Sequence, residues 1–365
     1  MVDEYLGEAD ATLRKRFIRK RMGLPAMLCA LMLVVTACGS SGNTQSQSAG
    51  SSTPSSPSPS ASSAAPASSA PAEKKIVLGF AQVGAESGWR TANTKSIQES
   101  AAAAGIELKF SDAQQKQENQ IKAIRSFIQQ KVDVIAFSPV VESGWDTVLK
   151  EAKDAGIPVV LTDRAIDSPD TSLYVSFLGS DFVEEGRRAG RWLVEQFKDH
   201  DGEVNIVELQ GTVGSAPAID RKAGFEEIIK DDPKFKIIAS QTGDFTRAKG
   251  KEVMQAFLKA HKNIDVLYAH NDDMALGAIQ AMEAAGLKPG EDIIIISVDG
   301  IRDAFVAASE GKINFIVECN PLLGPQLMDL VKKVVAGESV PKRIVTEERT
   351  FTIEEAIAEL PNRQY

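Results

Sequence analysis

Polar and charged residues stand where several apolar runs of the sequence stop, and these are the residues that could carry chemistry. The run Leu267–Ala269 ends at His270, Asn271, Asp272 and Asp273. Histidine, amide and carboxylate groups together are typical of a metal centre, of an acid/base pair, or of a polar pocket for a ligand. The function of the protein depends on which of these three applies.

A metal or cofactor site is disfavoured because the usual ligands do not cluster. The histidines His200, His261 and His270 are scattered, and neither H-x-x-x-H nor C-x-x-C occurs. The first predicted strand is not followed by either of the glycine-rich motifs that hold phosphates. We therefore predict no metal and no cofactor, and we interpret His270 as a residue at the end of a strand that does not contact the ligand.

Carboxylates and arginines occur together at the predicted strand ends. A pair of carboxylates leaves glycoside hydrolysis open, but a carboxylate beside an arginine has a lowered pKa and is a poor general acid. No Ser-His-Asp or G-x-S-x-G arrangement is present, so we predict no catalytic residue. The acidic residues at these positions are Glu86, Asp163, Asp272 and Asp299, and the basic ones are Arg90, Arg164 and Arg221.

These side chains match the groups that a sugar offers. A hydroxyl can donate to a carboxylate while it accepts from arginine or asparagine, and charge-assisted bonds of this kind are strong and directional. Trp89 and Phe245 are candidates to pack against the apolar face of a sugar ring. We interpret Asn271 as a ligand contact, and Asp272 as a helix cap that supports the site from behind.

Alternating strands and helices must position these residues. Eight apolar runs separated by helical segments predict strands within residues 76–83, 106–112, 132–139, 157–163, 204–211, 236–244, 265–272 and 292–300. Such runs indicate parallel sheets covered by helices on both faces, and the pattern restarts once, so we predict two doubly wound α/β lobes. Ligands of such sheets bind beyond the carboxyl ends of the strands, which is where the polar residues stand.

The first 74 residues predict export and anchoring. A basic segment precedes an apolar run that is suited to a signal peptide, predicted over residues 1–37. The run closes on "VVTAC", which resembles a bacterial lipobox and marks Cys38 as the lipidated residue. Residues 38–74 are rich in Ser, Ala and Pro and are predicted to be a disordered tether. The formal net charge of −9 argues against nucleic acid as a partner.

Six long motifs resemble a known family. They are "AQVGAESGWR", "QQKQENQIKA", "LTDRAID", "VELQGTVGSAPAIDRKAGF", "GDFTRAKGKEVM" and "YAHNDDMALGAIQA". From about Lys75 to Thr352 the chain resembles the periplasmic sugar-binding proteins of bacterial ABC importers, in the ribose-binding class, and within it the galactofuranose-binding members. The resemblance implies a type I fold whose two lobes are joined by a three-strand hinge. The implied function is capture of a monosaccharide between the lobes and its delivery to a membrane permease.

The resemblance also implies the site residues and the lobe boundaries. Carried over by motif, the ligand contacts are Glu86, Trp89, Arg90, Asp163, Arg164, Arg221, Phe245, Asn271, Asp299 and Glu318. The first lobe is expected to contain residues 75–180 and 319–342, and the second residues 181–318 and 343–355, followed by a tail at 356–365. The protein is expected to be a monomer, tethered by its lipid anchor to the outer face of the cell membrane.

Several alternatives remain open at this point. Galactofuranose is the preferred ligand, with arabinose, galactose and other small sugars as further candidates. A sugar-sensing co-receptor would use the same closed form, and a glycosidase would reveal itself by turnover. A repressor effector domain is disfavoured, because an export signal and not a helix-turn-helix precedes the body.

Overall fold

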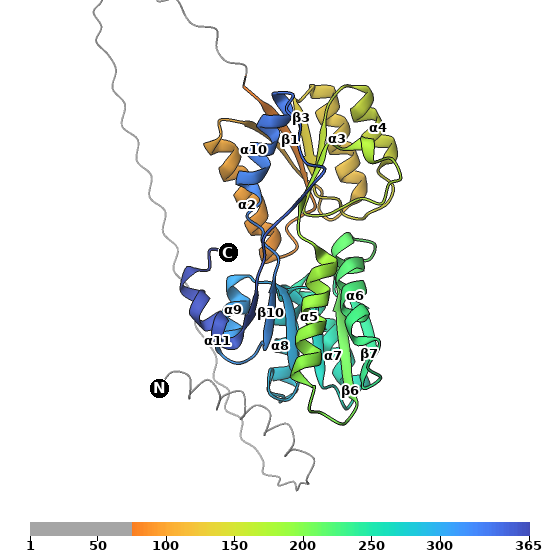
Figure 1. Cartoon of the computed structure of the whole chain (residues 1–365), viewed down its shortest axis with the longest axis vertical. Helices are drawn as coiled ribbons and strands as arrows, with labels where there is room; N and C mark the ends of the chain where they lie inside the picture. Colours follow the sequence, from red (N-terminus) through yellow and green to blue (C-terminus); the bar gives the residue numbers. More distant parts are fainter. Residues whose placement is uncertain (1–74) are drawn as a thin grey trace, which may run out of the picture. The chain divides into compact units, whose positions relative to one another are not determined.

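The strands of the first lobe form a six-stranded parallel sheet. The computed structural model describes residues 75–365, and in this part of the chain the sheet order is β11-β5-β4-β3-β1-β2. The chain passes back and forth across this sheet through its helices (Figure 1). The elements are β1 (Val77–Gln82), α2 (Gly88–Ala103), β2 (Glu107–Asp112), α3 (Gln117–Gln130), β3 (Val134–Phe137), α4 (Asp146–Asp154), β4 (Val159–Thr162), the short helix η1 (Thr171–Leu173), β5 (Ser176–Gly179), α10 (Gly324–Val335) and β11 (Arg343–Val345).

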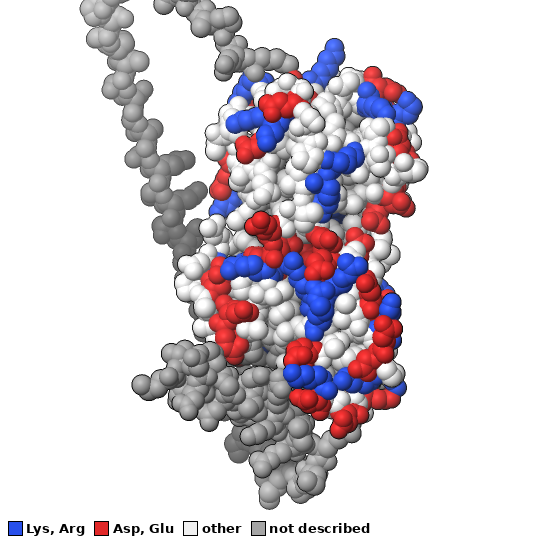
Figure 2. Space-filling model, viewed as in Figure 1, with Lys and Arg blue, Asp and Glu red and all other residues white. Residues whose placement is uncertain are grey.

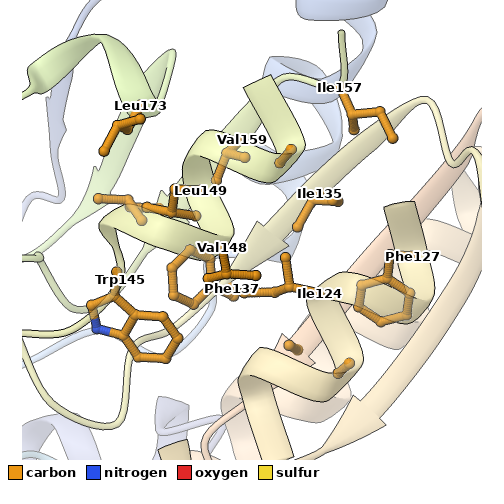
Figure 3. Close-up of a cluster of buried hydrophobic side chains, with 14 of the residues drawn as sticks. Ile124, Phe127, Ile135, Phe137, Trp145, Val148, Leu149, Ile157, Val159 and Leu173 are labelled. Carbon is orange, nitrogen blue, oxygen red and sulfur yellow. The ribbon is translucent and has the colours of Figure 1, made fainter. Parts of the chain in front are cut away.

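Both faces of this sheet are buried because successive side chains point to opposite sides. Ile135 and Phe137 of β3 pack with Trp145 and Leu149 beneath α3 and α4, in the cluster that Figure 3 shows. The intervening residues of the same strands face a second cluster, which α2 and α10 cover. The run of consecutive apolar residues in each central strand is thereby explained.

The second lobe repeats the architecture with one antiparallel edge. Its sheet order is β12-β10-β9-β8-β6-β7, and β12 runs antiparallel to β10. Helices α5 and α6 pack against each other, and α7 packs against α8. The elements are α5 (Phe182–Gln196), β6 (Val204–Gln210), α6 (Ala216–Ile229), β7 (Phe235–Thr242), α7 (Arg247–Ala260), β8 (Val266–Ala269), α8 (Asp272–Ala284), β9 (Ile294–Asp299), α9 (Arg302–Ser309), β10 (Phe315–Glu318), β12 (Thr350–Thr352), α11 (Ile353–Glu359) and the short helix η2 (Leu360–Asn362).

The chain crosses between the lobes three times. The crossings lie between β5 and α5, between β10 and α10, and between β11 and β12. The third crossing is later than the sequence suggested, because Arg343–Val345 pairs with β5 and so belongs to the first lobe. The residues after 355, expected to be a tail, pack on the second lobe, where Arg363 is only 8% exposed and binds Gly300 and Glu318.

All eight strands that the sequence predicted are present, whereas four others had not been predicted. The missed strands are β5, β10, β11 and β12, each of three or four residues. The predicted signal peptide, the lipidation site Cys38 and the tether lie outside the described residues. Among residues 75–365, no helix combines the length and apolar character that a membrane span requires.

Charges of both signs mix on the molecular face that Figure 2 shows. Acidic and basic side chains lie side by side in a band at the boundary between the lobes. Ion pairs such as Arg187 with Glu227, at 2.8 Å, are partly exposed and contribute little to stability. This face carries no extended positive surface of the kind that binds nucleic acid.

Candidate functional site

Strained backbone at the strand ends aims several predicted ligand residues into the cleft between the lobes. Asp163 follows β4 with φ of 60°, Phe245 lies after β7 with φ of 61°, and Asp299 ends β9 with φ of 120°. Positive φ is unfavourable for residues with a Cβ, and it occurs where the surroundings hold a side chain in a required direction. Asp163 is therefore presented at the carboxyl edge of the first-lobe sheet, and Phe245 and Asp299 at the carboxyl edge of the second-lobe sheet.

Arg90 organises the first-lobe side of the site. Its Nη2 donates to Asp163 Oδ2 at 2.7 Å, and its Nε donates to Glu86 Oε1 at 3.0 Å. Ser138 Oγ also donates to Asp163, at 2.8 Å. Burial alone would lower the pKa of Arg90, but the two carboxylates raise it above the ordinary arginine value. The arginine stays charged and holds both carboxylates in fixed positions.

Arg164 is buried with part of its bonding capacity unused. Its Nη1 donates to the carbonyl of Val140 at 3.2 Å, and its Nη2 lies 3.7 Å from Glu86 Oε1. The Nε of Arg164 and the Oε2 of Glu86 are both buried without a hydrogen-bond partner. Burial and the neighbouring Arg90 lower the pKa of Arg164 to about 10. A buried donor and a buried acceptor without partners are costly to the protein, and a hydroxylated ligand would satisfy both.

Arg221 holds the second-lobe side of the site. Glycines at the α5–α6 contact place these helices in direct backbone contact, since a Cβ on Gly224 would lie 2.0 Å from the Val183 carbonyl oxygen. Arg221 on α6 can therefore donate from Nε to Glu185 Oε2 on α5 at 2.7 Å. Its Nη2 lies 3.5 Å from Asp299 Oδ1.

The two carboxyl groups beside Arg221 have raised pKa values because they are buried. Burial raises the pKa of Glu185 to about 8 and that of Asp299 well above its ordinary value, although Arg221 opposes both shifts. A carboxyl group that retains its proton can donate as well as accept a hydrogen bond. Asp299 is therefore suited to a hydroxyl in either role.

Asn271 takes the capping role that the sequence suggested for Asp272, whereas Asp272 keeps only its supporting role behind the site. Asn271 is the N-cap of α8, since its Oδ1 accepts from Met274 N at 3.0 Å, and its Nδ2 donates to the Phe245 carbonyl at 3.2 Å. The prediction that Asp272 caps the helix was wrong. Its Oδ2 instead accepts from Gly300 N at 2.6 Å and Ile301 N at 2.7 Å, which fixes the turn that carries Asp299.

Aromatic rings form the apolar walls of the site. Trp89 is buried and donates from Nε1 to the Cys319 carbonyl at 2.7 Å. The guanidinium of Arg164 lies 5.3 Å from the centre of the Phe245 ring. A Cβ on Gly211 would lie only 1.8 Å from Phe245 Cζ, so the ring occupies the space that a side chain at position 211 would need. A flat apolar surface beside charged groups suits a sugar ring.

Side chains from both lobes line one cavity whose empty space, the open solvent at its mouth included, is about 280 Å³. Four lining residues, Ser87, Phe182, Pro217 and Cys319, were not predicted. The predicted ligand residues that line it are Glu86, Trp89, Arg90, Asp163, Arg164, Arg221, Phe245, Asn271 and Asp299.

Comparison with known families agrees with this architecture. Residues 78–339 match the family described as periplasmic binding protein domain, which is well over half of the chain. The chain is a periplasmic binding protein. Its two parallel-sheet lobes and three crossings are the type I fold of that family.

Three relatives of this binding protein are named for, or bound to, furanose sugars. It is 50% identical over 287 residues to the galactofuranose-binding protein YtfQ of Escherichia coli K12, covering 78% of this chain and 90% of that one. A structure from Mycobacterium smegmatis in complex with β-D-fucofuranose is 64% identical, with a TM-score of 0.78 over 80% of this chain and 95% of that one. A protein of the arabinose ABC transporter of Shewanella sp. ANA-3, bound to L-arabinofuranose, is 52% identical with a TM-score of 0.76, over 79% and 96%.

Glu318 is the one predicted ligand residue that the structure places outside the cavity lining. Its Oε1 accepts from Arg363 Nη1 at 2.6 Å, and its Oε2 accepts from Arg349 N at 3.0 Å. Its carboxylate thus joins the C-terminal segment to the second lobe of the binding protein. The next residue, Cys319, lies at the second crossing and lines the cavity instead.

His270 is buried below the site and does not line the cavity. One ring nitrogen, Nε2, lies 3.0 Å from Glu208 Oε1, and the ring packs against Tyr268 at 5.0 Å. Burial lowers the pKa of His270 despite the nearby carboxylate. The residue therefore supports the strand end that carries Asn271.

Acidic and thiol side chains gather where the three crossings meet. Among residues 75–365, Glu185, Cys319 and Glu348 are the one group of three whose potential metal-ligand atoms all lie within 4.8 Å of one another. Arg221 donates to Glu185 Oε2, and the Asn320 N–H donates to Glu348 at 3.0 Å, whereas Glu185 Oε1 is buried without a hydrogen-bond partner. This hinge cluster, Glu185, Cys319 and Glu348, links segments on which the angle between the lobes depends.

Proposed function

We propose that this periplasmic binding protein captures a small sugar in its furanose form and delivers it to the permease of an ABC importer. The proposal is supported by the furanose ligands of relatives that are 50–64% identical to the chain. Galactofuranose is the preferred ligand, and fucofuranose and arabinofuranose are the nearest alternatives. All three share a five-membered ring with several hydroxyl groups.

The observation that carries the proposal is the unused donor and acceptor on the first-lobe side. Arg164 Nε and Glu86 Oε2 are buried in the cavity lining without hydrogen-bond partners, although Arg164 Nε lies 3.7 Å from Asp163 Oδ2. Protein groups fix the rest of both side chains. A sugar hydroxyl can accept from the arginine, and the same or a neighbouring hydroxyl can donate to the carboxylate. An anionic ligand is less suitable on the first-lobe side, because the carboxylates of Glu86 and Asp163 already balance Arg90 and Arg164.

The second lobe completes the enclosure. Arg221, Asn271 and Asp299 face the cavity from the opposite side, and Trp89 and Phe245 supply apolar surface for the C–H groups of the ring. A ligand that contacts both lobes stabilises the closed form and shifts the population toward it. The closed form would then present one continuous surface, built from both lobes, to the permease.

The proposed role does not include catalysis. The carboxylates on the first-lobe side are held by Arg90 at 2.7 and 3.0 Å, an arrangement that fixes a ligand better than it transfers a proton. The full chain should therefore release no nitrophenol from p-nitrophenyl β-D-galactofuranoside. Lipidation of Cys38 and a tether over residues 38–74 would keep the protein on the outer face of the membrane, within reach of the permease.

Calorimetry with two locked sugar rings tests the choice of furanose. The full chain is titrated with 1,4-anhydro-D-galactitol, which has a five-membered ring, and with 1,5-anhydro-D-galactitol, which has a six-membered ring. Both lack the anomeric hydroxyl, so ring size is the variable that separates them. Tighter binding of the 1,4-anhydro compound is expected, and equal or tighter binding of the 1,5-anhydro compound would contradict the proposal.

A further inference from the structure

A carboxylate of the second lobe reaches across the cleft to the first helix of the first lobe. Asp273 Oδ2 accepts a hydrogen bond from the backbone N–H of Gly88, at 2.7 Å. Gly88 is the first residue of α2, and its N–H has no partner within that helix. Figure 1 shows α2 running from the first lobe toward the boundary between the lobes.

The contact is charged and its acceptor is buried, although Gly88 itself is exposed, and this distinguishes it from a chance approach of two surfaces. Asp273 is only 6% exposed, and its Oδ1 accepts from Arg247 Nε at 3.1 Å. Arg247 also binds Asp303 at 3.0 Å within the second lobe, so the carboxylate is held in one orientation. A carboxylate at a helix N-terminus satisfies a free N–H and interacts favourably with the helix dipole.

The helix that receives this contact carries two cavity residues. Trp89 and Arg90 directly follow Gly88, and both line the cavity. Asp273 itself does not line the cavity, so a ligand need not touch it. Any movement that separates the lobes must break the bond between Asp273 and Gly88, because the two residues belong to different lobes.

We propose that Asp273 is a positioning residue that latches the cleft shut by binding the N-terminus of α2. The latch slows release of the sugar without contacting it. This inference rests on the proposed function for its kinetic consequence, since a latch on an occupied cleft sets the residence time of the ligand. Its structural part, the bond to the Gly88 amide, does not depend on which ligand binds.

Gly88 provides a test from the other lobe. A Cβ on Gly88 would lie 3.1 Å from Ile301 Cδ1 and 3.4 Å from Asp273 Oδ2, both in the second lobe. Its φ is not positive, so alanine suits this helical position and should raise the stability of the folded chain. The two close contacts arise only when the lobes are together, so the added Cβ opposes closure and should speed ligand release. Gly88→Ala should therefore raise the melting temperature of the sugar-free chain while it speeds release. A purely structural defect would change both quantities in the unfavourable direction.

The kinetic experiment uses the full chain and D-fucose. Release is followed by stopped-flow tryptophan fluorescence, because Trp89 lines the cavity. Loss of a charge-assisted hydrogen bond predicts release about tenfold faster or more for Asp273→Ala. Asp273→Asn, which keeps one acceptor oxygen, should fall between this variant and wild type. The matched control is Asp303→Asn, which removes a partner of Arg247 but no contact between lobes; its release rate should stay within about twofold of wild type.

Hydrogen exchange at Gly88 separates failure of the latch from failure of the proposed function. The Gly88 amide should exchange faster in Asp273→Ala than in wild type or in Asp303→Asn, with or without sugar. If wild type binds no furanose but this difference is present, the proposed function is wrong and the contact stands. If Gly88 exchanges equally in all three proteins, or if Asp273→Ala lowers only the melting temperature and leaves release unchanged, the latch is refuted.

Discussion

Substitution of Gly211 by alanine should close the cavity from behind, through Phe245. The added Cβ would lie 1.8 Å from Cζ and 2.3 Å from both Cε atoms of the Phe245 ring, where ordinary contacts are 3.4–4 Å. The ring must therefore move by about 1.6 Å or more. Its backbone cannot easily follow, because Asp244 and Phe245 both hold positive φ angles. We expect the ring to turn toward the cavity and toward Arg164.

The size of the effect follows from the cost of overpacking. If the sugar needs the ring in its original place, the bound form carries about 1–3 kcal/mol of strain. That strain corresponds to a loss of affinity of roughly 5- to 150-fold. The free protein avoids most of the strain, because the moving group is the end of a side chain. Calorimetry should therefore show much weaker sugar binding, while the melting temperature without sugar changes little.

A double variant supplies the control. Phe245→Ala removes the ring, so the added methyl group at position 211 then has space. The variant with both substitutions should bind sugar no more weakly than Phe245→Ala alone, as a thermodynamic cycle requires for residues that act through one contact. An unchanged affinity in Gly211→Ala would refute the reasoning, and so would a further loss in the double variant.

Three further predictions concern the arginine, the anchor and pH. Arg164→Ala should weaken sugar binding about 100-fold or more. It should not lower the melting temperature, because burial disfavours the charge of Arg164 and lowers its pKa to about 10. Retained affinity in calorimetry would contradict the assigned cavity. Cys38→Ser should move the protein from the membrane to the soluble fraction, and continued retention would count against lipidation. Burial lowers the pKa of His270 below its ordinary value of 6.5, so the folded protein takes up this proton less readily than the unfolded chain. The free energy of unfolding therefore decreases as the pH falls below 6.5. His270→Gln should show a smaller drop in melting temperature from pH 7 to pH 5 than wild type. An equal drop in the two proteins would show that protonation of His270 is not the cause.

The fold was predictable where hydrophobic pattern decides structure. The run Val134–Phe137 is apolar on both faces of a sheet, and a strand buried between two layers of helices is the direct reading of such a run. Strand β11 is only three residues long and partly exposed, so no comparable signal marks it. Its place in the first lobe depends on pairing with β5, which is about 165 residues earlier in the chain.

The site was predictable in its residue types more than in its contacts. Polar residues after buried strands indicated the edge of the sheet where Asp163 and Asp299 lie. The cap of α8 was placed one residue too late, an error within the ordinary uncertainty of helix boundaries. Glu318 could not be placed from its motif, because its partner Arg363 lies at the far end of the chain. The contact between Gly88 and Asp273 likewise joins residues that no local pattern connects.

The order in which the three crossings divide the chain constrains its biosynthesis. The first lobe needs α10 to cover residues such as Leu78 and Phe80, and α10 begins only at Gly324. The second lobe needs β12 and Arg363, which lie near the C-terminus. Neither half can reach its native packing while the ribosome still holds the last forty residues or so. Each lobe therefore completes its native packing only when synthesis is almost finished, an order that suits passage through a secretion channel before folding.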